Sequence, residues 1–341
     1  MTSQFTLRAM STLAPEIQPL DALATFCKAA GEPLRLSILR VLSNNSFGVL
    51  ELAHIFSTSQ SGISHHLKVL TQAGLVTARR EGNAIFYRRS LTHESEPHLL
   101  NTLLLSLDAQ PIEPSNLQRI NEIHLERAAT SAAFFQRIGH EFTQNQELIA
   151  SLTQYLDGLL NLLDSLQFSS ESQVIEIGPG DGSFLPALSQ RFAQVVAVDN
   201  SPHMLQQARE RCHALAINNV SLIQADALTT ELPATDCMIL NMVLHHLAAP
   251  AAAIQQLAQA IKPGGSLIIS ELCQHDQVWA HQTCGDLWLG FAQDELARWA
   301  TLAGLTSRDS IYLGLKNGFQ IQLRHFVKPD HEAITLIQES K

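Results

Sequence analysis

The sequence predicts two folded regions of different class: a small α+β domain, followed by a larger α/β domain with a doubly wound sheet. Residues 22–92 hold helix-length apolar repeats and then two short strands that flank Gly82 and Asn83. Residues 174–182 read V-I-E-I-G-P-G-D-G, which is typical of a strand buried on both faces that enters a glycine-rich turn. Strand-like and helix-like segments then alternate up to residue 326, and this alternation favours a Rossmann-like parallel sheet.

The overall composition is that of an ordinary folded protein. The 341 residues are enough for two or three domains with full cores, and 45% hydrophobic with 16% charged residues excludes a disordered chain. Apolar runs stop short of the roughly 18 residues that a membrane helix needs, and the first twenty residues lack a signal-peptide pattern. The cysteines form no C-x-x-C pair, so we expect a reducing, cytoplasmic location without disulfides or a zinc ribbon. They are Cys27, Cys212, Cys237, Cys273 and Cys284.

Charge is distributed unevenly along the chain. Residues 21–92 hold eight Lys or Arg and four acidic residues, a net charge of +4. The whole chain carries −10, so the remainder carries −14. A basic segment joined to an acidic body indicates that the N-terminal segment binds a polyanion.

The N-terminal elements read as a winged helix-turn-helix. Helices are expected at 22–30, from Pro33 to about residue 43, at 49–56 and at 60–75. In the last of these helices Ile63, Leu67 and Leu70 form an inward stripe, and Gly74 suits its C-terminus. The basic hairpin of 75–80 and 84–89 follows as the wing.

The motifs between residues 29 and 88 resemble the ArsR/SmtB family of bacterial repressors. They read A-x-G-E-P-L-R-L-S-I-L-R-V-L, E-L-A, S-Q-S-G-I-S-H-H-L-K-V-L-T-Q-A-G-L-V and R-R-E-G-N-x-I-F-Y-R. The resemblance implies a homodimer on a double-stranded DNA operator, with the recognition helices in successive major grooves. It places at the DNA Gln60, Ser61, Ser64, His65, His66 and Lys68 on the recognition helix. It places on the DNA backbone Arg79, Arg80, Arg88 and Arg89 of the wing. The alternative is a winged helix that binds protein and leaves its arginines solvated.

The family's metal sites are not expected here. The segment V-L-E-L-A at 49–53 has no thiol where metal-sensing members have a cysteine pair. His93, Glu94, Glu96 and His98 form a loose group that Pro97 interrupts, and such residues at a helix start are more often solvated. The sequence therefore predicts no metal site.

The middle of the chain is expected to be helical. Residues 98–107 are apolar nearly all round and predict a buried helix, which in the repressor family packs at the dimer interface. Two prolines mark 109–116 as a linker. A long helix at 117–145 resembles the lead-in of repressor modules joined to a methyltransferase, and a helix at 147–166 would cover the sheet. Phe134 and Phe135 either reach the mouth of the ligand site or, as is more common, simply pack.

The glycine-rich turn and the motifs after it resemble class I S-adenosylmethionine-dependent methyltransferases, a seven-stranded Rossmann-like fold. The turn is G-x-G-x-G, whereas a dinucleotide-binding turn needs glycine at position 183, which is Ser183. The next strand ends in Asp199, which is placed to accept hydrogen bonds from both ribose hydroxyls. Asp226 after a third strand and K-P-G-G at 262–265 also match, so a Rossmann oxidoreductase is disfavoured.

The resemblance implies S-adenosylmethionine as cofactor and S-adenosylhomocysteine as product. In the family's motif II the acid binds the ribose, an apolar residue just beyond it faces the adenine, and a later acid accepts from the adenine amine. The cofactor residues implied are Glu176, Gly178, Gly180, Gly182, Asp199, Asn200, Met204, Asp226, Ala227 and Asn241.

The methyl acceptor is expected to be a small molecule. The fourth strand leads into N-M-V-L at 241–244, not the D/N-P-P-Y/F/W of DNA amino-methyltransferases, and no Pro-Cys nucleophile is present. The segment 273–291 gathers histidines and aromatics where such enzymes build a substrate lid, so His275 or Asp276 is a candidate base. The other interpretation of this segment is plain packing. His246 is a third candidate, although a structural role is more typical.

These motifs lead to one principal hypothesis and two alternatives. We expect a transcriptional regulator whose second domain binds S-adenosylmethionine and methylates a small molecule. The first alternative is a non-catalytic repressor that senses S-adenosylmethionine and S-adenosylhomocysteine and gates operator binding. The second is a metabolic methyltransferase whose winged helix only dimerises. The expected domains are a flexible tail at 1–20, a DNA-binding and dimerisation domain at 21–108, a linker at 109–116, a helical lead-in at 117–168, a methyltransferase domain at 169–328 and a C-terminal tail at 329–341.

Overall fold

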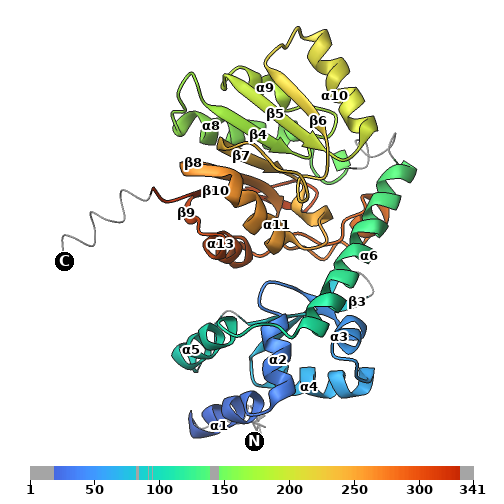
Figure 1. The fold of residues 1–341 in the computed structure, drawn as a ribbon, viewed down its shortest axis with the longest axis vertical. Coiled ribbons are helices and arrows are strands. Elements are labelled where there is room, and N and C mark those ends of the chain that lie inside the picture. Colours follow the sequence, from blue (N-terminus) through green and yellow to red (C-terminus); the bar gives the residue numbers. More distant parts are fainter. Residues whose placement is uncertain (1–18, 82–83, 91, 94, 139–145, 331–341) are drawn as a thin grey trace, which may run out of the picture. The chain divides into compact units, whose positions relative to one another are not determined.

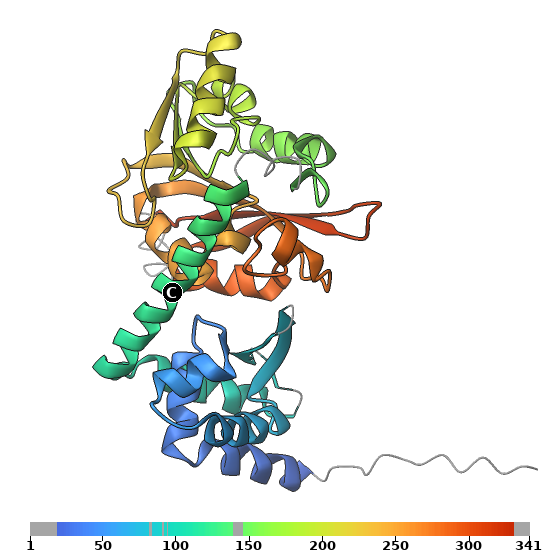
Figure 2. The same ribbon diagram turned by 90° about the vertical axis from the view of Figure 1, so that its right-hand side faces the viewer.

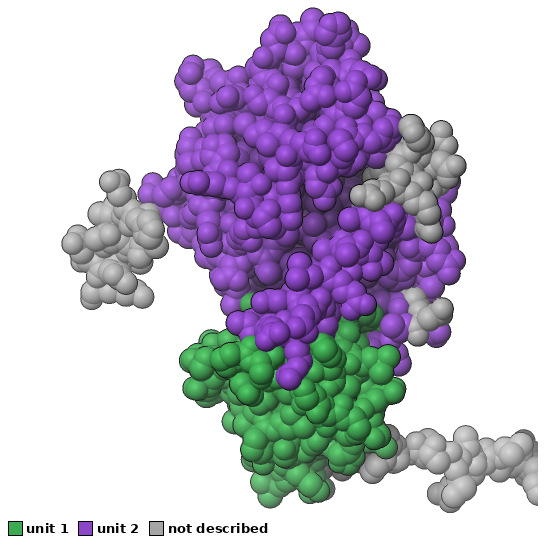
Figure 3. Space-filling view, turned by 45° about the vertical axis from the view of Figure 1, so that its right-hand side comes forward, with its two compact units in different colours: residues 1–79, 86–116 green, residues 80–85, 117–341 purple. Residues whose placement is uncertain are grey.

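The computed structural model describes residues 19–81, 84–90, 92–93, 95–138 and 146–330. The chain divides into two compact units, residues 1–79 with 86–116 and residues 80–85 with 117–341 (Figure 3). Within the described residues, no helix combines the length and apolar character that crossing a membrane would require. The tip of the predicted hairpin, residues 82–83, lies outside the described residues, as do Glu94 and both predicted tails beyond residues 19 and 330.

The first unit is a helical bundle with a small antiparallel sheet (Figure 1). Its sheet has the strand order β1-β3-β2. The core is formed by side chains from every helix, among them Phe26, Leu39, Leu52, Leu67 and Leu100. The elements are α1 (Pro19–Ala30), α2 (Pro33–Val41), β1 (Phe47–Gly48), α3 (Val49–Ile55), α4 (Gln60–Gln72), β2 (Val76–Glu81), β3 (Ala84–Arg89) and α5 (Pro97–Asp108).

The helix boundaries follow from local capping. Glu32 accepts hydrogen bonds from the first amides of α2, Leu34 N and Arg35 N, and Pro33 occupies the first turn. Ser59 caps α4 through Gly62 N. Gly74, with φ of +68°, turns the chain out of α4 into the wing, so the helix predicted at 60–75 ends at Gln72, three residues earlier than expected.

The segment after the wing differs in detail from expectation. In α5 the side chains of Leu100 and Leu104 are buried, but Leu105 is 64% exposed. The predicted burial of this helix is therefore only partial within one chain. The predicted linker at 109–116 is partly helical, because α6 (Pro114–Ile138) begins at Pro114, whose fixed φ suits a first helical turn.

The second unit is a seven-stranded sheet with the order β6-β5-β4-β7-β8-β10-β9 (Figures 1 and 2). The strands from β6 to β8 run parallel, and β10 pairs antiparallel with both β8 and β9. The strands are β4 (Gln173–Ile177), β5 (Gln194–Asp199), β6 (Val220–Gln224), β7 (Thr235–Asn241), β8 (Ile261–Leu272), β9 (Thr306–Gly314) and β10 (Gln320–Val327). The helical elements are η1 (Leu152–Gln154), α8 (Leu156–Ser165), α9 (Leu185–Ser189), α10 (Pro202–Ala214), η2 (Leu244–His246), α11 (Pro250–Leu257), η3 (Ala258–Ala260), α12 (Trp279–Thr283) and α13 (Gln293–Leu302).

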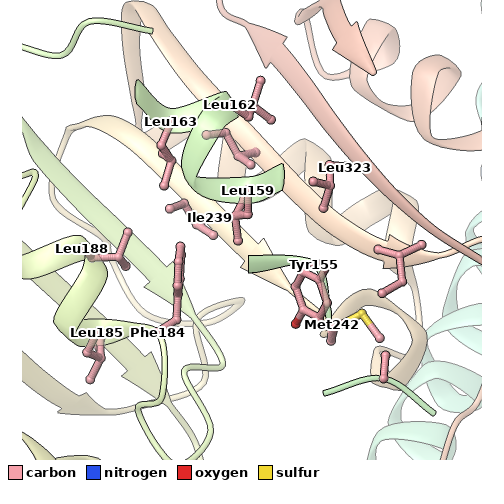
Figure 4. Packing of buried hydrophobic residues seen from close by; sticks show 14 of the residues in the cluster. Tyr155, Leu159, Leu162, Leu163, Phe184, Leu185, Leu188, Ile239, Met242 and Leu323 are labelled. Carbon is pink, nitrogen blue, oxygen red and sulfur yellow. The ribbon is translucent and has the colours of Figure 1, made fainter. Parts of the chain in front are cut away.

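The main core lies between the sheet and helices α8, α9 and α10. Leu159 and Leu163 of α8 and Phe184 next to α9 pack on Ile239 of β7 and Leu323 of β10 (Figure 4). Helices α11 and α13 pack together and cover the other side of the sheet (Figure 1). Covering on both faces explains why the central strands are apolar at successive positions.

The predicted helix at 147–166 is shorter in the structure. Ser151 and Gln154 form a capping box around η1, and α8 begins only at Leu156. Leu148, which lies within the predicted helix, is 57% exposed. Apolar spacing alone did not reveal the break, because the leucines before and after it keep a helical period.

Candidate cofactor site and nucleic-acid interface

The glycine turn after β4 leaves an open space at its centre. Gly178, Gly180 and Gly182 have φ of +65°, +56° and +76°, in the left-handed region that favours glycine. A Cβ on Gly178 would lie 2.7 Å from Val243 Cγ2, and one on Gly182 would lie 2.9 Å from Ala208 Cα. Among the described residues, a Cβ on Gly180 would meet nothing within 4 Å. The outer glycines therefore let β4 approach its neighbours, while the middle one faces space that a ligand can fill.

Glu176 supplies a buried carboxylate just before this turn. It is 1% exposed, and its Oε2 has no hydrogen-bond partner in the part of the chain that the structure describes. Burial, together with Asp181 and Asp199, raises the pKa of Glu176 to about 8. A buried carboxylate oxygen without a partner is unfavourable in its charged form unless a cationic group joins it, so this position suits a ligand with an ammonium group.

Asp199 ends β5 beside the turn. Burial raises the pKa of Asp199, although the backbone amides of Ser201, Gly180 and Asn200 donate to its carboxylate and oppose this effect. The bond from Ser201 N is 2.8 Å long. The amide of Gly180 thus links Asp199 to the open centre of the glycine turn, and the carboxylate lies where parallel strands β4 and β5 end.

The other expected cofactor residues follow the neighbouring strands. Met204 is buried in the first turn of α10, whose N-cap is Ser201, and Asn200 is exposed next to it. Asp226 is exposed and accepts from Leu228 N, with buried Ala227 beside it. Asn241 at the end of β7 accepts a hydrogen bond from Tyr155 Oη at 3.0 Å. All of these residues lie at or just after the carboxyl ends of β5, β6 and β7, so they are on the same side of the sheet as the glycine turn after β4.

A second buried polar group lies after β7 and at the end of β8. Nδ1 of His245 lies 2.6 Å from Glu271 Oε1, and His245 N donates to Glu271 Oε2. Both side chains are essentially unexposed. Burial acts to lower the pKa of His245, but Glu271 and Asp286 outweigh it and raise this pKa to about 9.

Asp286 and His246 complete this group. Burial raises the pKa of Asp286 to about 7 against the opposing effect of His245, while burial and His245 hold the pKa of His246 well below its ordinary value. Asp286 Oδ1 lies 3.9 Å from His245 Nε2 and 3.9 Å from His246 Nδ1. One atom from each of the three residues lies within 4.8 Å of the others, a grouping that could hold a metal ion. The sequence-based expectation of no metal site did not foresee it.

Helix α6 packs against the segments that carry His246 and Asp286. Ser131 Oγ donates to His246 O at 3.3 Å, and Arg127 donates to Ala248 O while its guanidinium lies over the Trp288 ring. A Cβ on Gly285 would clash with the Phe134 ring at 2.3 Å, so Phe134 packs directly on the turn before Asp286. The side chain of Phe135 lies outside the described residues.

His275 and Asp276, the expected bases, lie in the loop after β8. The His275 ring packs edge-on against Phe319 at 4.7 Å, near the start of β10, and its Nδ1 accepts from Gln277 N. Asp276 is exposed. Of the three expected catalytic residues, His246 alone belongs to the buried group at β7 and β8, and a base role for any of them stays a prediction.

In the first unit, α4 presents a polar face. Gln60, Ser61, Ser64, His65 and Lys68 are exposed, and Ile63, Leu67 and Leu70 are buried on the opposite side. His66 differs from the expectation. Its side chain is only 21% exposed, and its Nδ1 lies 3.6 Å from Glu32 Oε2 at the start of α2. His66 follows His65 directly, and one residue along an α-helix rotates the side chain by about 100°, away from the polar face.

Comparison with known families assigns both regions. Residues 32–78 match the family model of bacterial regulatory proteins of the arsR family, and residues 175–269 match that of a methyltransferase domain. The chain joins an ArsR-family module to a class I methyltransferase domain. The sheet order, with its antiparallel β10, agrees with this assignment.

The relatives cover parts of the chain. An uncharacterized 37.1 kDa protein in transposon TN4556 of Streptomyces fradiae is 31% identical over 113 residues, 32% of this chain and 33% of that protein. The chain therefore spans about a third of the length of this relative. A ubiquinone biosynthesis O-methyltransferase of Stutzerimonas stutzeri is 26% identical over 196 residues, 53% of this chain and 84% of that protein. The solved N-methyltransferase NodS from Bradyrhizobium japonicum, in complex with S-adenosyl-L-homocysteine, has 18% identity and a TM-score of 0.44, covering 55% of this chain and 98% of that one.

The wing of the ArsR module corrects one expected DNA contact. Arg89 is 2% exposed and forms a bidentate pair with Asp108 at the end of α5, at 2.8 and 2.5 Å. A guanidinium held inside the module cannot reach a phosphate, so Arg89 is structural. Arg80 is exposed, whereas Arg79 and Arg88 are half-buried, with Arg88 Nε donating to Thr77 Oγ1.

Several residues of the methyltransferase domain were missed by sequence reasoning. Tyr155 lies 86 residues before its partner Asn241 in the sequence. Glu271 lies 26 residues after its partner His245, and Asp286 lies farther still along the chain from His245. Only the position of Glu271 at the end of a predicted strand could have marked it, since an acid closing an apolar strand is unusual. Asp286 lies in the expected lid segment 273–291, but its approach to His245 depends on how the loop folds back.

Proposed function

We propose that this protein is a DNA-binding regulator whose methyltransferase domain binds S-adenosylmethionine and transfers its methyl group to a small molecule. The single observation that supports this best is the turn at Gly180, open at its centre and flanked by the carboxylates of Glu176 and Asp199. The match of residues 175–269 to the methyltransferase family model supports the same proposal.

The residues around the turn fit the parts of this cofactor. The buried Oε2 of Glu176 suits the ammonium of its amino-acid part, and the carboxylate of Asp199 suits two ribose hydroxyls. Buried Met204 and exposed Asp226 suit an adenine ring and its amine. The cofactor supplies a sulfonium methyl group, which a nucleophile takes by in-line displacement. The protein then has to orient the acceptor and exclude water.

A small acceptor is favoured over a DNA base. The place after β7 reads Asn241, Met242, Val243 and Leu244, without the proline-aromatic motif of DNA amino-methyltransferases. The S. stutzeri relative is named as an O-methyltransferase of ubiquinone biosynthesis, and a hydroxyl acceptor is the counterpart proposed here.

The ArsR module would supply operator recognition as a homodimer in the cytoplasm. The exposed polar face of α4 suits the major groove, and the exposed Leu105 of α5 suits burial against a second copy. Five free cysteines suit a reducing compartment.

Calorimetry of S-adenosylmethionine binding to the full chain tests the cofactor site. We expect Asp199→Ala to weaken binding at least tenfold, because it removes the acceptor of two charge-assisted hydrogen bonds. The matched control Asp157→Ala changes an exposed acid on α8 and should bind normally. Absence of binding to the unchanged protein would overturn the proposal.

Transfer of a labelled methyl group to extracted metabolites, and operator binding with and without the cofactor, test the two activities. Labelled product together with specific DNA binding supports the bifunctional regulator. Cofactor binding without product, but with a change in operator affinity, supports the ligand-sensing repressor in its place.

A further inference from the structure

The group formed by His245, His246 and Asp286 has no role in the cofactor site described above. It joins two neighbouring residues of η2 to one from the loop between α12 and α13, and all three side chains are at least nine-tenths buried. Imidazole nitrogens and a carboxylate are the ligand set that proteins use for zinc and related divalent metals.

The carboxylate of Asp286 is the part of this group that most requires a counter-ion. Both of its carboxylate oxygens are buried without a hydrogen-bond partner among the described residues. A buried carboxylate in that state is strongly unfavourable, and proteins satisfy it with hydrogen bonds, a cation or protonation. His245 Nε2 is likewise buried with no hydrogen bond to any described residue, and it lies on the side of Asp286.

Glu271 prepares His245 as a ligand. Its Oε1 lies 2.6 Å from His245 Nδ1, so the proton of a neutral imidazole is held at Nδ1 and the lone pair is left at Nε2. Glu271 itself is held by Leu272 N and His245 N. A carboxylate bonded to the far nitrogen of a histidine is the usual outer support of a zinc ligand.

We propose that His245, His246 and Asp286 bind a zinc(II) ion, with at least one coordination position left open. Ligand atoms about 2.0–2.1 Å from zinc at tetrahedral angles lie about 3.4 Å apart, whereas octahedral neighbours lie about 2.9 Å apart. The two 3.9 Å separations from Asp286 Oδ1 are nearer the tetrahedral value. All three ligand atoms lie within 4.8 Å of one another, so the side chains have to move closer together when the ion binds.

The competing explanation is a doubly protonated His245 paired with Asp286. In that case an Nε2–H would face the carboxylate, and a charged pair this deeply buried should form a hydrogen bond of about 2.7–2.9 Å. The observed 3.9 Å is too long for one. The distance suits a site with an ion between the two groups better than a direct contact.

The site lies next to the cofactor turn. Val243, two residues before His245, is the residue that a Cβ on Gly178 would strike. An open position on the ion would accept water or an oxygen, nitrogen or sulfur atom of a small acceptor. This last role rests on the proposed methyl transfer, whereas the binding of zinc does not.

Metal titration of the full chain, after removal of metals with a chelator, tests the site. We expect one tight Zn²⁺ per chain, and with Co²⁺ the visible absorption bands of a four-coordinate ion. Asp286→Asn keeps the side-chain shape, and we expect it to lose at least tenfold in Zn²⁺ affinity and to lose the Co²⁺ bands. The matched control Asp294→Asn changes an exposed acid on α13 and should keep both.

The unfolding temperature and a Glu271→Gln variant provide two further tests of the zinc site. Zn²⁺ should raise the unfolding temperature of the unchanged protein but not that of Asp286→Asn, whose metal-free form should be at least as stable because an unpaired buried charge is gone. Glu271→Gln should weaken Zn²⁺ binding roughly 10- to 100-fold. Equal binding by the unchanged protein and Asp286→Asn would overturn the zinc site. Cofactor binding, measured separately by calorimetry, reports on the proposed function independently.

Discussion

Single side chains in this protein show two ways of burying a charge. Arg89 is buried with a carboxylate that satisfies it, and the pair connects the wing strand β3 to the end of α5. Glu176 is buried beside two other acids, and one of its oxygens has no partner among the described residues. The first arrangement is complete and stabilises the fold, whereas the second requires either a bound proton or a cationic group beside the carboxylate.

The raised pKa of Glu176 predicts a pH dependence of stability. A carboxyl whose folded-state pKa is about 8, against an ordinary 4.5, stays protonated in the folded state while it ionises in the unfolded chain. Its contribution is therefore fully present below about pH 4.5 and is lost as pH rises to about 8, with a slope near 1.4 kcal/mol per pH unit. Denaturant unfolding without cofactor should show stability falling between pH 5 and 8, where Asp286 contributes in the same direction, and Glu176→Gln should reduce the slope by about 1.4 kcal/mol per pH unit. An unchanged slope in Glu176→Gln would assign it to other groups.

The buried pair of Arg89 and Asp108 predicts separate effects on stability and DNA binding. Arg89→Lys cannot keep the bidentate geometry, so we expect a loss of about 1–3 kcal/mol in the unfolding free energy of the ArsR module. The salt dependence of operator affinity should stay unchanged. Arg80→Ala is the matched comparison, since Arg80 is exposed, and it should reduce the salt slope with little loss of stability. A reduced salt slope in Arg89→Lys would return Arg89 to the DNA surface.

Among the helices and strands, those with strong local signals were predictable. The inward stripe of α4 and the glycine turn after β4 both depend on neighbouring residues, so the sequence indicated them. Arg89 was misassigned because its partner Asp108 is 19 residues away, and a basic residue on a wing looks the same from sequence whether it is exposed or paired. The position of Asp286 depends on the loop path between α12 and α13, which no local pattern encodes.

The polar face of α4 predicts how its residues divide the work of DNA binding. Lys68 is exposed near the C-terminal half of the helix, so it suits a phosphate, while Gln60 lies in the first turn, where base edges are read. Lys68→Ala should weaken binding to all sequences alike and lower the salt slope by about one for each phosphate that the side chain neutralises. Gln60→Ala should relax sequence preference at one position, measured by competition between operator variants. The reverse pattern would mean that the helix docks in another orientation.

The exposed Leu105 of α5 predicts the oligomeric state. An apolar side chain 64% exposed on a helix whose neighbours Leu100 and Leu104 are buried suits an interface between two copies. We expect Leu105→Glu to shift the protein from dimer to monomer in analytical ultracentrifugation. Leu302→Glu, at a 44% exposed position on α13, is the control and should remain dimeric. A monomeric unchanged protein would show that α5 serves another purpose.

The molecule as a whole consists of two units with separate hydrophobic cores. The fold of each was predictable, because family-like motifs and alternation of strands and helices extend over the whole region. The compact-unit boundary falls between residues 116 and 117, where the helical lead-in was expected to begin, but residues 80–85 of the wing group with the second unit. Spacing and composition do not indicate such a grouping, since these six residues are continuous in sequence with the rest of the hairpin.

Separate cores predict a local effect of the cofactor. Binding at a hundredfold excess over Kd should stabilise the methyltransferase domain by about 2.7 kcal/mol. Hydrogen exchange should therefore slow most in the core of the second unit, at β4, β5 and β7, while the amides of α2 and α4 should change little. Equal protection across both units would show that they unfold as one cooperative body.

Strand β10 has a consequence for the synthesis of the protein. It follows β9 in the chain, yet it lies between β8 and β9 in the sheet. At roughly 5–20 residues per second, β8 leaves the ribosome several seconds before its partner exists. During that interval the apolar edge of β8 is unpaired, and the segments that hold Glu271 and Asp286 lack their support. The ArsR module needs none of these residues for its core, so we expect a nascent chain to carry a folded ArsR module before the methyltransferase domain can complete its sheet.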